Sequence, residues 1–234
     1  MRIEIAGLTT HIVEGRPGTG QGTTTILLHG FGAPGDDLVA LARYIDAPGR
    51  FVFPEAPLEL SGMHGGARAW WLLDLVKLEQ ELRAGTPRDR SGELPDGLPA
   101  ARTQVSRLVD QVQARFGIGD DAIVLGGFSQ GAMLALDVAL HRDAAPAGIV
   151  LMSGTLVAES AWGPRFAKLA KTPVFQSHGK ADTLLPYSVA ETLRDKLRAA
   201  GAVVEWHPFV GGHEIPPLVL HELGAFLTKR ANSG

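Results

Sequence analysis

A serine stands at the centre of the run G-F-S-Q-G, residues 127–131. The preceding residues 123–125 are apolar and begin with two β-branched side chains, and the segment that follows favours a helix. Glycines on both sides remove the Cβ atoms that would collide when a strand turns sharply into a helix. The pattern predicts a nucleophile elbow, with Ser129 as the nucleophile of an acyl-transfer reaction.

A serine hydroxyl needs a histidine to take its proton and an acid to orient that histidine. In sheets with such an elbow, the acid and then the histidine follow the serine in the chain, each on a loop after a strand. Asp182 comes just after the apolar run 174–178, and His213 follows the run 203–209 and two glycines. We therefore expect Asp182 as the acid and His213 as the base. Activity should fall at low pH, because only a neutral imidazole accepts the serine proton.

Attack on a carbonyl creates an oxyanion that backbone N–H groups can stabilise. The segment L-L-H-G-F-G, residues 27–32, follows an early strand. Its glycines have no side chains that would cover the backbone N–H groups of the loop. One donor of such a site usually comes from this loop and the other from the residue after the nucleophile. The backbone N–H groups of Phe31 and Gln130 are therefore the predicted oxyanion donors.

Other titratable residues offer alternative readings. His178 is the main alternative base, but it precedes Asp182 in the chain, so a packing or loop-stapling role suits it better. Asp137, Asp74 and Asp195 lie in patterns typical of structural or solvated carboxylates. Four histidines (His29, His64, His178 and His213) lack the short paired spacing of a metal site. We expect no metal and no cofactor.

Short apolar runs alternate with helical patterns along the chain, as in a mostly parallel sheet with helices on both faces. This predicts an α/β fold whose strands span 24–28, 50–53, 122–125, 148–152, 174–178 and 203–209. Apolar residues between 105 and 116 recur at helical spacing, and Gly117 follows as a stop signal. Ser188 and Glu191 form a capping-box pattern for a helix that ends at Gly201, and Pro216-Pro217 opens the last helix.

Residues 54–100 do not show this alternation of apolar runs and helical patterns. They hold five prolines and several glycines, and only 70–82 has a helical pattern. Such an excursion commonly forms the wall or lid of a substrate pocket, and the alternative is a variable surface loop. The apolar residues at its centre favour the pocket. Met63, Trp70 and Trp71 are the predicted acyl-side wall.

Composition limits the class of protein. A length of 234 residues suits one domain, 1–234, with the excursion inside it. A net charge of −3 gives no basic field for nucleic acid, and the absence of cysteine excludes a thiolate nucleophile. No apolar stretch suits a signal peptide or an integral membrane span, so we expect a cytoplasmic protein acting on a small-molecule ester. A homodimer is left open.

Several motifs together resemble the phospholipase/carboxylesterase family, which includes bacterial carboxylesterases and acyl-protein thioesterases. The elbow at 127–131 is identical to that of the family, and 28–32 and 211–215 look like its oxyanion and histidine loops. The segment 69–71, and the spacing of His178-Gly179 with Asp182 and Pro186, are also similar. Two features differ: Phe31 replaces a common leucine, and residues 76–100 are longer and richer in proline. The resemblance implies an α/β-hydrolase fold.

Together these observations predict a serine carboxylesterase that works through an acyl-enzyme on Ser129. One alternative keeps the triad but makes the protein an acyl thioesterase or a lysophospholipase. Another is a non-catalytic protein that uses the hydrolase fold to bind a ligand, because fold alone does not guarantee chemistry. The presence of all three triad positions argues against that second alternative.

Overall fold

The computed structural model describes residues 1–17, 22–61, 65–74, 76, 79, 80, 83 and 89–232. The main sheet of this described part is built from β1 (Arg2–Ile5), β2 (Leu8–Glu14), β3 (Thr24–Leu28), β4 (Arg50–Pro54), β7 (Ile123–Phe128), β8 (Gly148–Met152), β9 (Pro173–Gly179) and β10 (Val203–Phe209). Their order across the sheet is β1-β2-β4-β3-β7-β8-β9-β10. From β4 to β10 neighbouring strands are parallel, whereas β1 and β2 form an antiparallel pair at one edge. The six predicted strands are confirmed.

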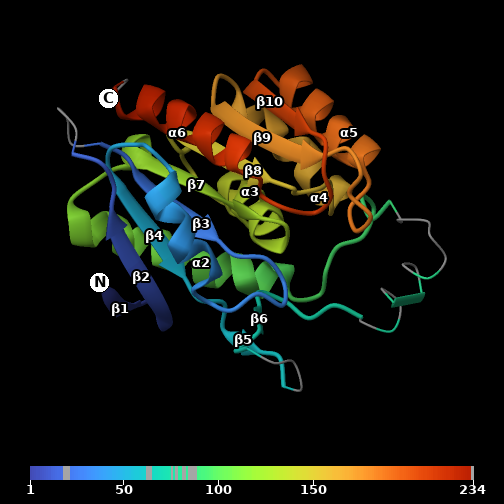
Figure 1. The fold of residues 1–234 in the computed structure, drawn as a ribbon. Helices are drawn as coiled ribbons and strands as arrows, with labels where there is room; N and C mark the ends of the chain where they lie inside the picture. Colours follow the sequence, from blue (N-terminus) through green and yellow to red (C-terminus); the bar gives the residue numbers. More distant parts are fainter. Residues whose placement is uncertain are drawn as a thin grey trace.

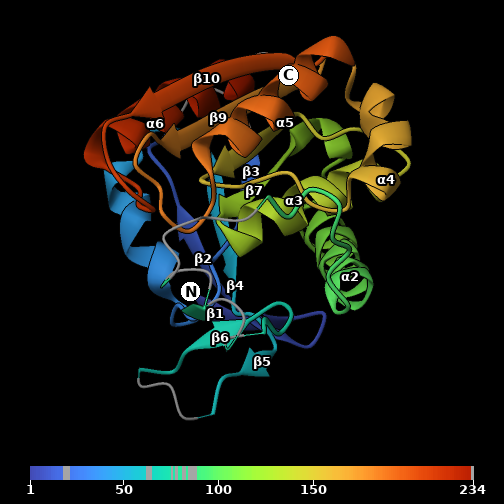
Figure 2. The same cartoon turned by 90° about the vertical axis from the view of Figure 1, so that its right-hand side faces the viewer.

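Helices cover both faces of the sheet, as Figures 1 and 2 show. One face carries η1 (Asp37–Tyr44) and α6 (Pro217–Ala231). The other carries α2 (Leu98–Phe116), α3 (Gln130–His141), α4 (Glu159–Trp162), η3 (Gly163–Leu169) and α5 (Tyr187–Ala199). Each face buries its own apolar cluster, so the inner parallel strands are buried on both sides, whereas the edge strand β10 is mostly only partly buried. The predicted α/β architecture is confirmed.

Local sequence signals explain most helix ends. The apolar positions of α2 face the core, and Gly117 ends the helix in the left-handed region at φ 65°. Pro217 occupies the first turn of α6, where its missing N–H costs no intrahelical bond. The predicted capping box of α5 is wrong, because the N-cap is Pro186 and Ser188 already lies inside the helix. The fixed φ of Pro186 sets the start of the helix two residues before the expected cap at Ser188.

The N-terminal hairpin of β1 and β2 was not predicted. Its strands alternate between buried and more exposed positions, and its turn places Ala6 and Gly7 at φ 52° and 75°. The hairpin pairs with β4 and so extends the sheet on the side away from β10. It therefore adds an antiparallel edge to an otherwise parallel sheet.

The excursion at 54–100 contains a small antiparallel pair, β5 (Leu58–Glu59) with β6 (Arg68–Ala69), which projects from the body in Figure 2. The predicted helix at 70–82 is wrong at its start, because residues 70–74 are not helical. Most of its remainder lies outside the described residues, as do Met63 and His64.

Candidate active site

Ser129 occupies the sharp turn between β7 and α3. Its backbone lies at φ 54° and ψ −118°, a conformation that costs a non-glycine residue free energy and is typical of functional turns. A Cβ at Gly127 or Gly131 would collide with the carbonyl oxygen of Leu28, at the end of β3. The two flanking glycines therefore let the turn pack directly on the neighbouring strand, with Ser129 only partly buried.

The predicted acid and base are hydrogen-bonded to each other. His213 donates from Nδ1 to Asp182 Oδ2 over 2.7 Å, and the carboxylate is fully buried. The other oxygen, Oδ1, accepts the backbone N–H groups of Leu184 and Leu185, both at 2.9 Å. Burial alone would raise the pKa of Asp182, but His213 and these two N–H groups outweigh it and hold the pKa below its ordinary value. The site therefore keeps this carboxylate ionised.

Neighbouring strands bring these two residues together. Phe209 at the end of β10 is paired with Gly179 at the end of β9, so the loops that follow leave the sheet at the same level. Gly179 has no side chain to clash with the carbonyl of Gly212, and Ala181 N–H donates to the Gly211 carbonyl over 2.9 Å. The histidine loop thus lies directly on the loop that carries Asp182.

The imidazole of His213 also contacts the elbow. Its ring centroid lies 4.8 Å from that of Phe128, the residue before Ser129. Ser129 N–H donates to the Met152 carbonyl over 2.9 Å, which fixes the elbow to the end of β8. The loops after β7, β9 and β10 therefore meet at the carboxyl edge of the sheet, where ligands bind in open α/β folds.

The loop after β3 lies beside the elbow. A Cβ at Gly30 would come within 3.2 Å of the Phe128 ring and 3.4 Å of the Ser129 Cβ. The buried His29 donates from Nδ1 to the Gly30 carbonyl over 2.8 Å and accepts the Ala56 N–H at Nε2 over 3.0 Å. Burial lowers the pKa of His29, so the neutral ring serves both bonds. Phe31 N–H donates no backbone hydrogen bond within the described residues, and Gln130 N–H stands at the open N-terminus of α3.

The Gln130 side chain plays a part that the sequence did not reveal. Its Oε1 accepts the Trp70 N–H and its Nε2 donates to the Trp71 carbonyl, both over 2.9 Å. The Trp70 indole N–H in turn donates to the His29 carbonyl over 3.0 Å. Partners some 60 residues apart leave no local sequence signal, which explains why this contact was missed.

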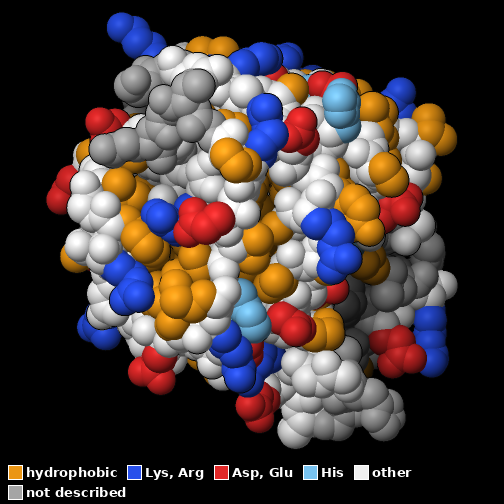
Figure 3. All heavy atoms as spheres, turned by 60° about the vertical axis from the view of Figure 1, so that its left-hand side comes forward, with side chains coloured by type: hydrophobic (Ala, Val, Ile, Leu, Met, Phe, Trp, Pro, Cys, Tyr) orange, Lys and Arg blue, Asp and Glu red, His pale blue; other side chains and the backbone are white. Residues whose placement is uncertain are grey.

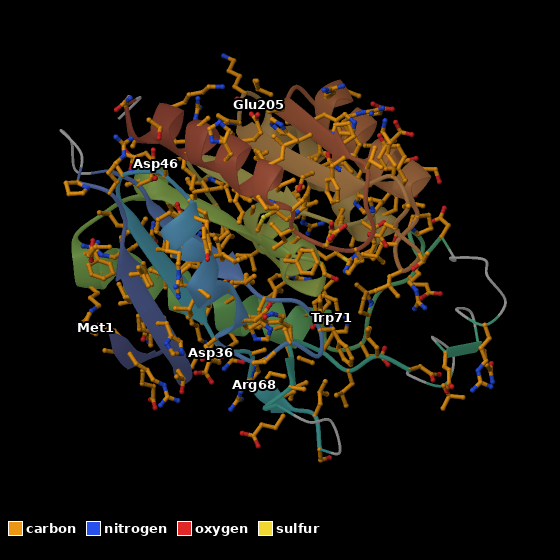
Figure 4. All side chains as sticks on the ribbon, in the orientation of Figure 1. Met1, Asp36, Asp46, Arg68, Trp71 and Glu205 are labelled. Atoms are coloured by element: carbon orange, nitrogen blue, oxygen red, sulfur yellow. The ribbon has the colours of Figure 1, made fainter. Side chains whose placement is uncertain are left out.

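Both tryptophans are only 2% exposed. Trp71, labelled in Figure 4, packs against Gly97 at the start of α2, and its indole N–H finds no acceptor in the described part of the chain. Trp70 holds the loop after β3 through its bond to the His29 carbonyl. Their role as the acyl-side wall stays a prediction.

The alternative base His178 lies at the end of β9 and is fully buried. Its Nε2 donates to the Leu185 carbonyl over 3.0 Å, so that nitrogen faces the Asp182 turn. Asp137, interpreted from sequence as structural, binds Arg102 and Trp162 within the helical layer. The structure thus brings Ser129, Asp182 and His213 to one edge of the sheet and keeps Asp137 elsewhere.

The surface shows no broad field of one charge on the face drawn in Figure 3, where basic and acidic side chains are interspersed. Hydrophobic side chains form separate groups among them. In the described part of the chain, no helix combines the length and apolarity needed to cross a membrane.

Comparison with curated proteins gives relatives with named activities. The chain is 29% identical over 219 residues to acyl-protein thioesterase 1 of Neurospora crassa, covering 88% of this chain and 86% of that protein. It is 30% identical over 207 residues to a probable carboxylesterase of Oryza sativa subsp. japonica, covering 86% of this chain and 74% of the relative. Relatives of both kinds are acyl hydrolases, which indicates hydrolase activity for this chain.

Solved structures agree with the fold. The crystal structure of esterase PE8 superposes with a TM-score of 0.78 at 30% identity and covers 95% of this chain and 98% of that one. The Bacillus cereus carboxylesterase, at 20% identity and a TM-score of 0.72, shares the fold over 95% of this chain and 94% of its own. The model of the phospholipase/carboxylesterase family matches residues 11–231. The chain therefore belongs to the phospholipase/carboxylesterase family and has the α/β-hydrolase fold.

Proposed function

We propose that this protein is a serine carboxylesterase in which Ser129, His213 and Asp182 form the catalytic triad. The observation that carries the proposal is the 2.7 Å hydrogen bond from His213 to Asp182, beside the strained turn that carries Ser129. In the acylation step Ser129 Oγ attacks the ester carbonyl while His213 Nε2 takes its proton. The same proton then passes to the departing alcohol, and water deacylates Ser129 by the reverse route.

The local groups support each role. Because Nδ1 of His213 donates to Asp182, Nε2 of the neutral ring carries the lone pair that a general base needs. The ionised carboxylate stabilises the imidazolium that forms when the proton is taken. Backbone N–H groups of Phe31 and Gln130 are the proposed oxyanion donors, and each such donor typically contributes about 2.7 to 4 kcal/mol to the transition state.

The proposed substrate is a small-molecule carboxylic ester. The second candidate, an acyl thioester, is favoured by one specific observation: the N. crassa relative is an acyl-protein thioesterase that matches 88% of this chain. A thioester carbonyl would use the same nucleophile, base and oxyanion donors. The two candidates therefore differ in the leaving group and acyl chain that are accepted.

Labelling with a fluorophosphonate probe tests the nucleophile. The probe should modify the wild-type protein at Ser129 and leave Ser129→Ala unlabelled. Ser153→Ala is the matched control, because Ser153 also lies at positive φ, 46°, at the end of the neighbouring strand, but is fully buried. Modification at another residue, or a labelled Ser129→Ala, would overturn the proposal.

A substrate panel then separates the candidates. p-Nitrophenyl esters from acetate to palmitate, long-chain acyl thioesters and lysophospholipids are compared by kcat/KM. A carboxylesterase should favour the esters and a thioesterase the acyl thioesters. A protein that turns over none of them while a ligand raises its melting temperature would instead be a non-catalytic binder.

A further inference from the structure

The carboxylate of Asp182 lies between two imidazoles. Its Oδ2 is 2.7 Å from His213 Nδ1 and 3.3 Å from His178 Nε2. Both side chains of the second pair are completely buried, whereas His213 keeps 14% of its side chain exposed. The two rings therefore approach the same oxygen, one from the site and one from the protein interior.

The surroundings of His178 fix its protonation. Its Nε2 faces two acceptors, the Leu185 carbonyl at 3.0 Å and Asp182 Oδ2 at 3.3 Å, so Nε2 must carry a proton. Burial, with a smaller contribution from His213, lowers the pKa of His178 more than the Leu185 carbonyl, Asp182 and the Gly154 backbone raise it, which favours the neutral ring. The lone pair then sits on Nδ1, which is buried. His178 is thus a fixed donor to the Leu185 carbonyl, beside the acid, and not a base for Ser129.

His178 also closes the turn that carries the acid. Leu184 and Leu185 donate their N–H groups to Asp182 Oδ1, and the Leu185 carbonyl accepts from His178. The turn is therefore tied at its start by the Asp182 side chain and at its end by the His178 ring. Such a closed set of bonds limits rotation of the carboxylate about χ1 and χ2.

We propose that His178 is a positioning residue of the triad, whose Nε2–H holds the Asp182 turn so that Oδ2 faces His213. This inference rests on the proposed function, because it assigns His178 a role only through Asp182. A role in packing alone makes a different prediction. The ring centroid of Tyr187 lies 6.2 Å away, and an apolar side chain of similar volume would fill the same space.

Two substitutions separate the roles. His178→Leu keeps apolar volume and removes the donor, whereas His178→Gln places an amide N–H at the same number of bonds from the backbone. We expect His178→Leu to lower kcat by about 10- to 100-fold, the loss typical when a group that orients a metal-site ligand is removed, taken here as the scale for an orienting group, with KM unchanged. His178→Gln should recover most of that loss.

The matched control is His207→Leu. His207 lies on the adjacent strand beside Ser177, stacks on Phe175 with ring centroids 4.5 Å apart, and does not contact Asp182. It should keep the wild-type kcat. Thermal unfolding verifies that each variant folds. If His178→Leu does not fold, His178→Asn replaces it, because its amide is one bond too short to reach the Leu185 carbonyl.

A readout independent of turnover completes the test. The His213 Nδ1 proton, hydrogen-bonded to Asp182, is followed by NMR as a downfield resonance in each variant. It should persist in wild type, His178→Gln and His207→Leu, and shift or broaden in His178→Leu. A wild type inactive on every ester would defeat the proposed function while this resonance still tests the positioning role. The inference is overturned if His178→Leu keeps both kcat and the resonance, or if His178→Gln is as impaired as His178→Leu.

Discussion

Two buried aspartates, Asp182 after β9 and Asp137 in α3, are held in contrasting ways. Asp137 accepts from Arg102 Nε over 2.6 Å and from Trp162 Nε1 over 2.8 Å. Asp182 accepts from imidazole and from backbone N–H groups, and no arginine or lysine pairs with it in the described part of the chain.

The difference lies in the charge of the partner. Arginine is permanently cationic, so the Asp137 pair is fixed and serves to join α2, α3 and α4. His213 takes a proton only during the proposed reaction, so its interaction with Asp182 strengthens when the imidazolium forms. His141 also lies near Asp137, with its Nδ1 3.5 Å from Oδ1, but only Asp137 has a permanent cation beside it. A carboxylate paired with a permanent cation suits structure, whereas one whose partners are imidazole and backbone N–H groups suits catalysis.

The largest effect should come from neutralising each aspartate in turn. Asp182→Asn should lower kcat about 10,000-fold, as loss of the orienting carboxylate does in serine hydrolases. Asp137→Asn should leave the kcat of the folded protein close to wild type, because the side chain bonds only within the helical layer. Ester hydrolysis measured on both variants checks this. Equal losses of kcat in the two variants would contradict the assignment of a catalytic part to Asp182 and a structural part to Asp137.

The Asp137 pair should matter for stability rather than for kcat. Arg102→Met leaves the Asp137 carboxylate, 1% exposed, without its cation, and breaking such a pair typically costs about 3 to 5 kcal/mol. Urea unfolding followed by circular dichroism measures the loss. The control is Arg83→Met, which removes an exposed pair with Glu79 and should cost about 1 kcal/mol or less. Similar losses in the two variants would show that the Asp137 pair contributes no more than a surface pair.

Gln130→Ala tests a neutral polar group inside the site. It leaves the Trp70 N–H and the Trp71 carbonyl without their partner, and each buried unpaired group costs about 1 to 3 kcal/mol. The backbone N–H of residue 130 stays in place, so kcat should fall much less than in Asp182→Asn. Urea unfolding and ester hydrolysis give the two numbers. A loss of kcat as large as that of Asp182→Asn would assign the amide side chain a direct catalytic part.

The smallest effect concerns pH. Burial lowers the pKa of His141, which lies beside Asp137, against the opposing effect of that residue's carbonyl and carboxylate. Above about pH 6.5 the ring is neutral in both folded and unfolded chains, and below it the unfolded chain binds the proton more readily. Stability should therefore decline as pH falls below 6.5, and less steeply in His141→Gln. Urea unfolding at pH 7 and 5.5 measures both slopes, and identical slopes would contradict this prediction.

Much of the fold followed from local patterns in the sequence. The inner parallel strands are buried on both faces and read as largely apolar runs, which is why they were predicted, and the edge strand β10 was also found although most of its residues are only partly buried. The β1–β2 hairpin was missed because its strands are short or half polar and form an edge. The helix predicted from residue 70 does not start there, because Gln130, far along the chain, binds the Trp70 N–H and the Trp71 carbonyl. Tertiary contacts of that kind override local propensity.

The candidate site was predictable as far as chain order allowed. Order and strand ends singled out Ser129, Asp182 and His213, and the latter two are hydrogen-bonded. The partners of Asp182 beyond His213 were not predictable, because the Leu184 and Leu185 N–H groups depend on the shape of one turn. The contact from His178 was likewise hidden, since sequence gives no side-chain direction at the end of a strand.

The hydrogen bond from His213 to Asp182 spans 31 residues of chain and encloses the whole of α5 and β10. It therefore ties together the two ends of the segment that forms the last edge of the sheet, in addition to its part in the proposed chemistry. A covalent inhibitor that displaces the His213 ring would break this bond and so change the rate at which β10 opens. The rate of amide hydrogen exchange along β10 would then report the state of His213, which lies outside that strand.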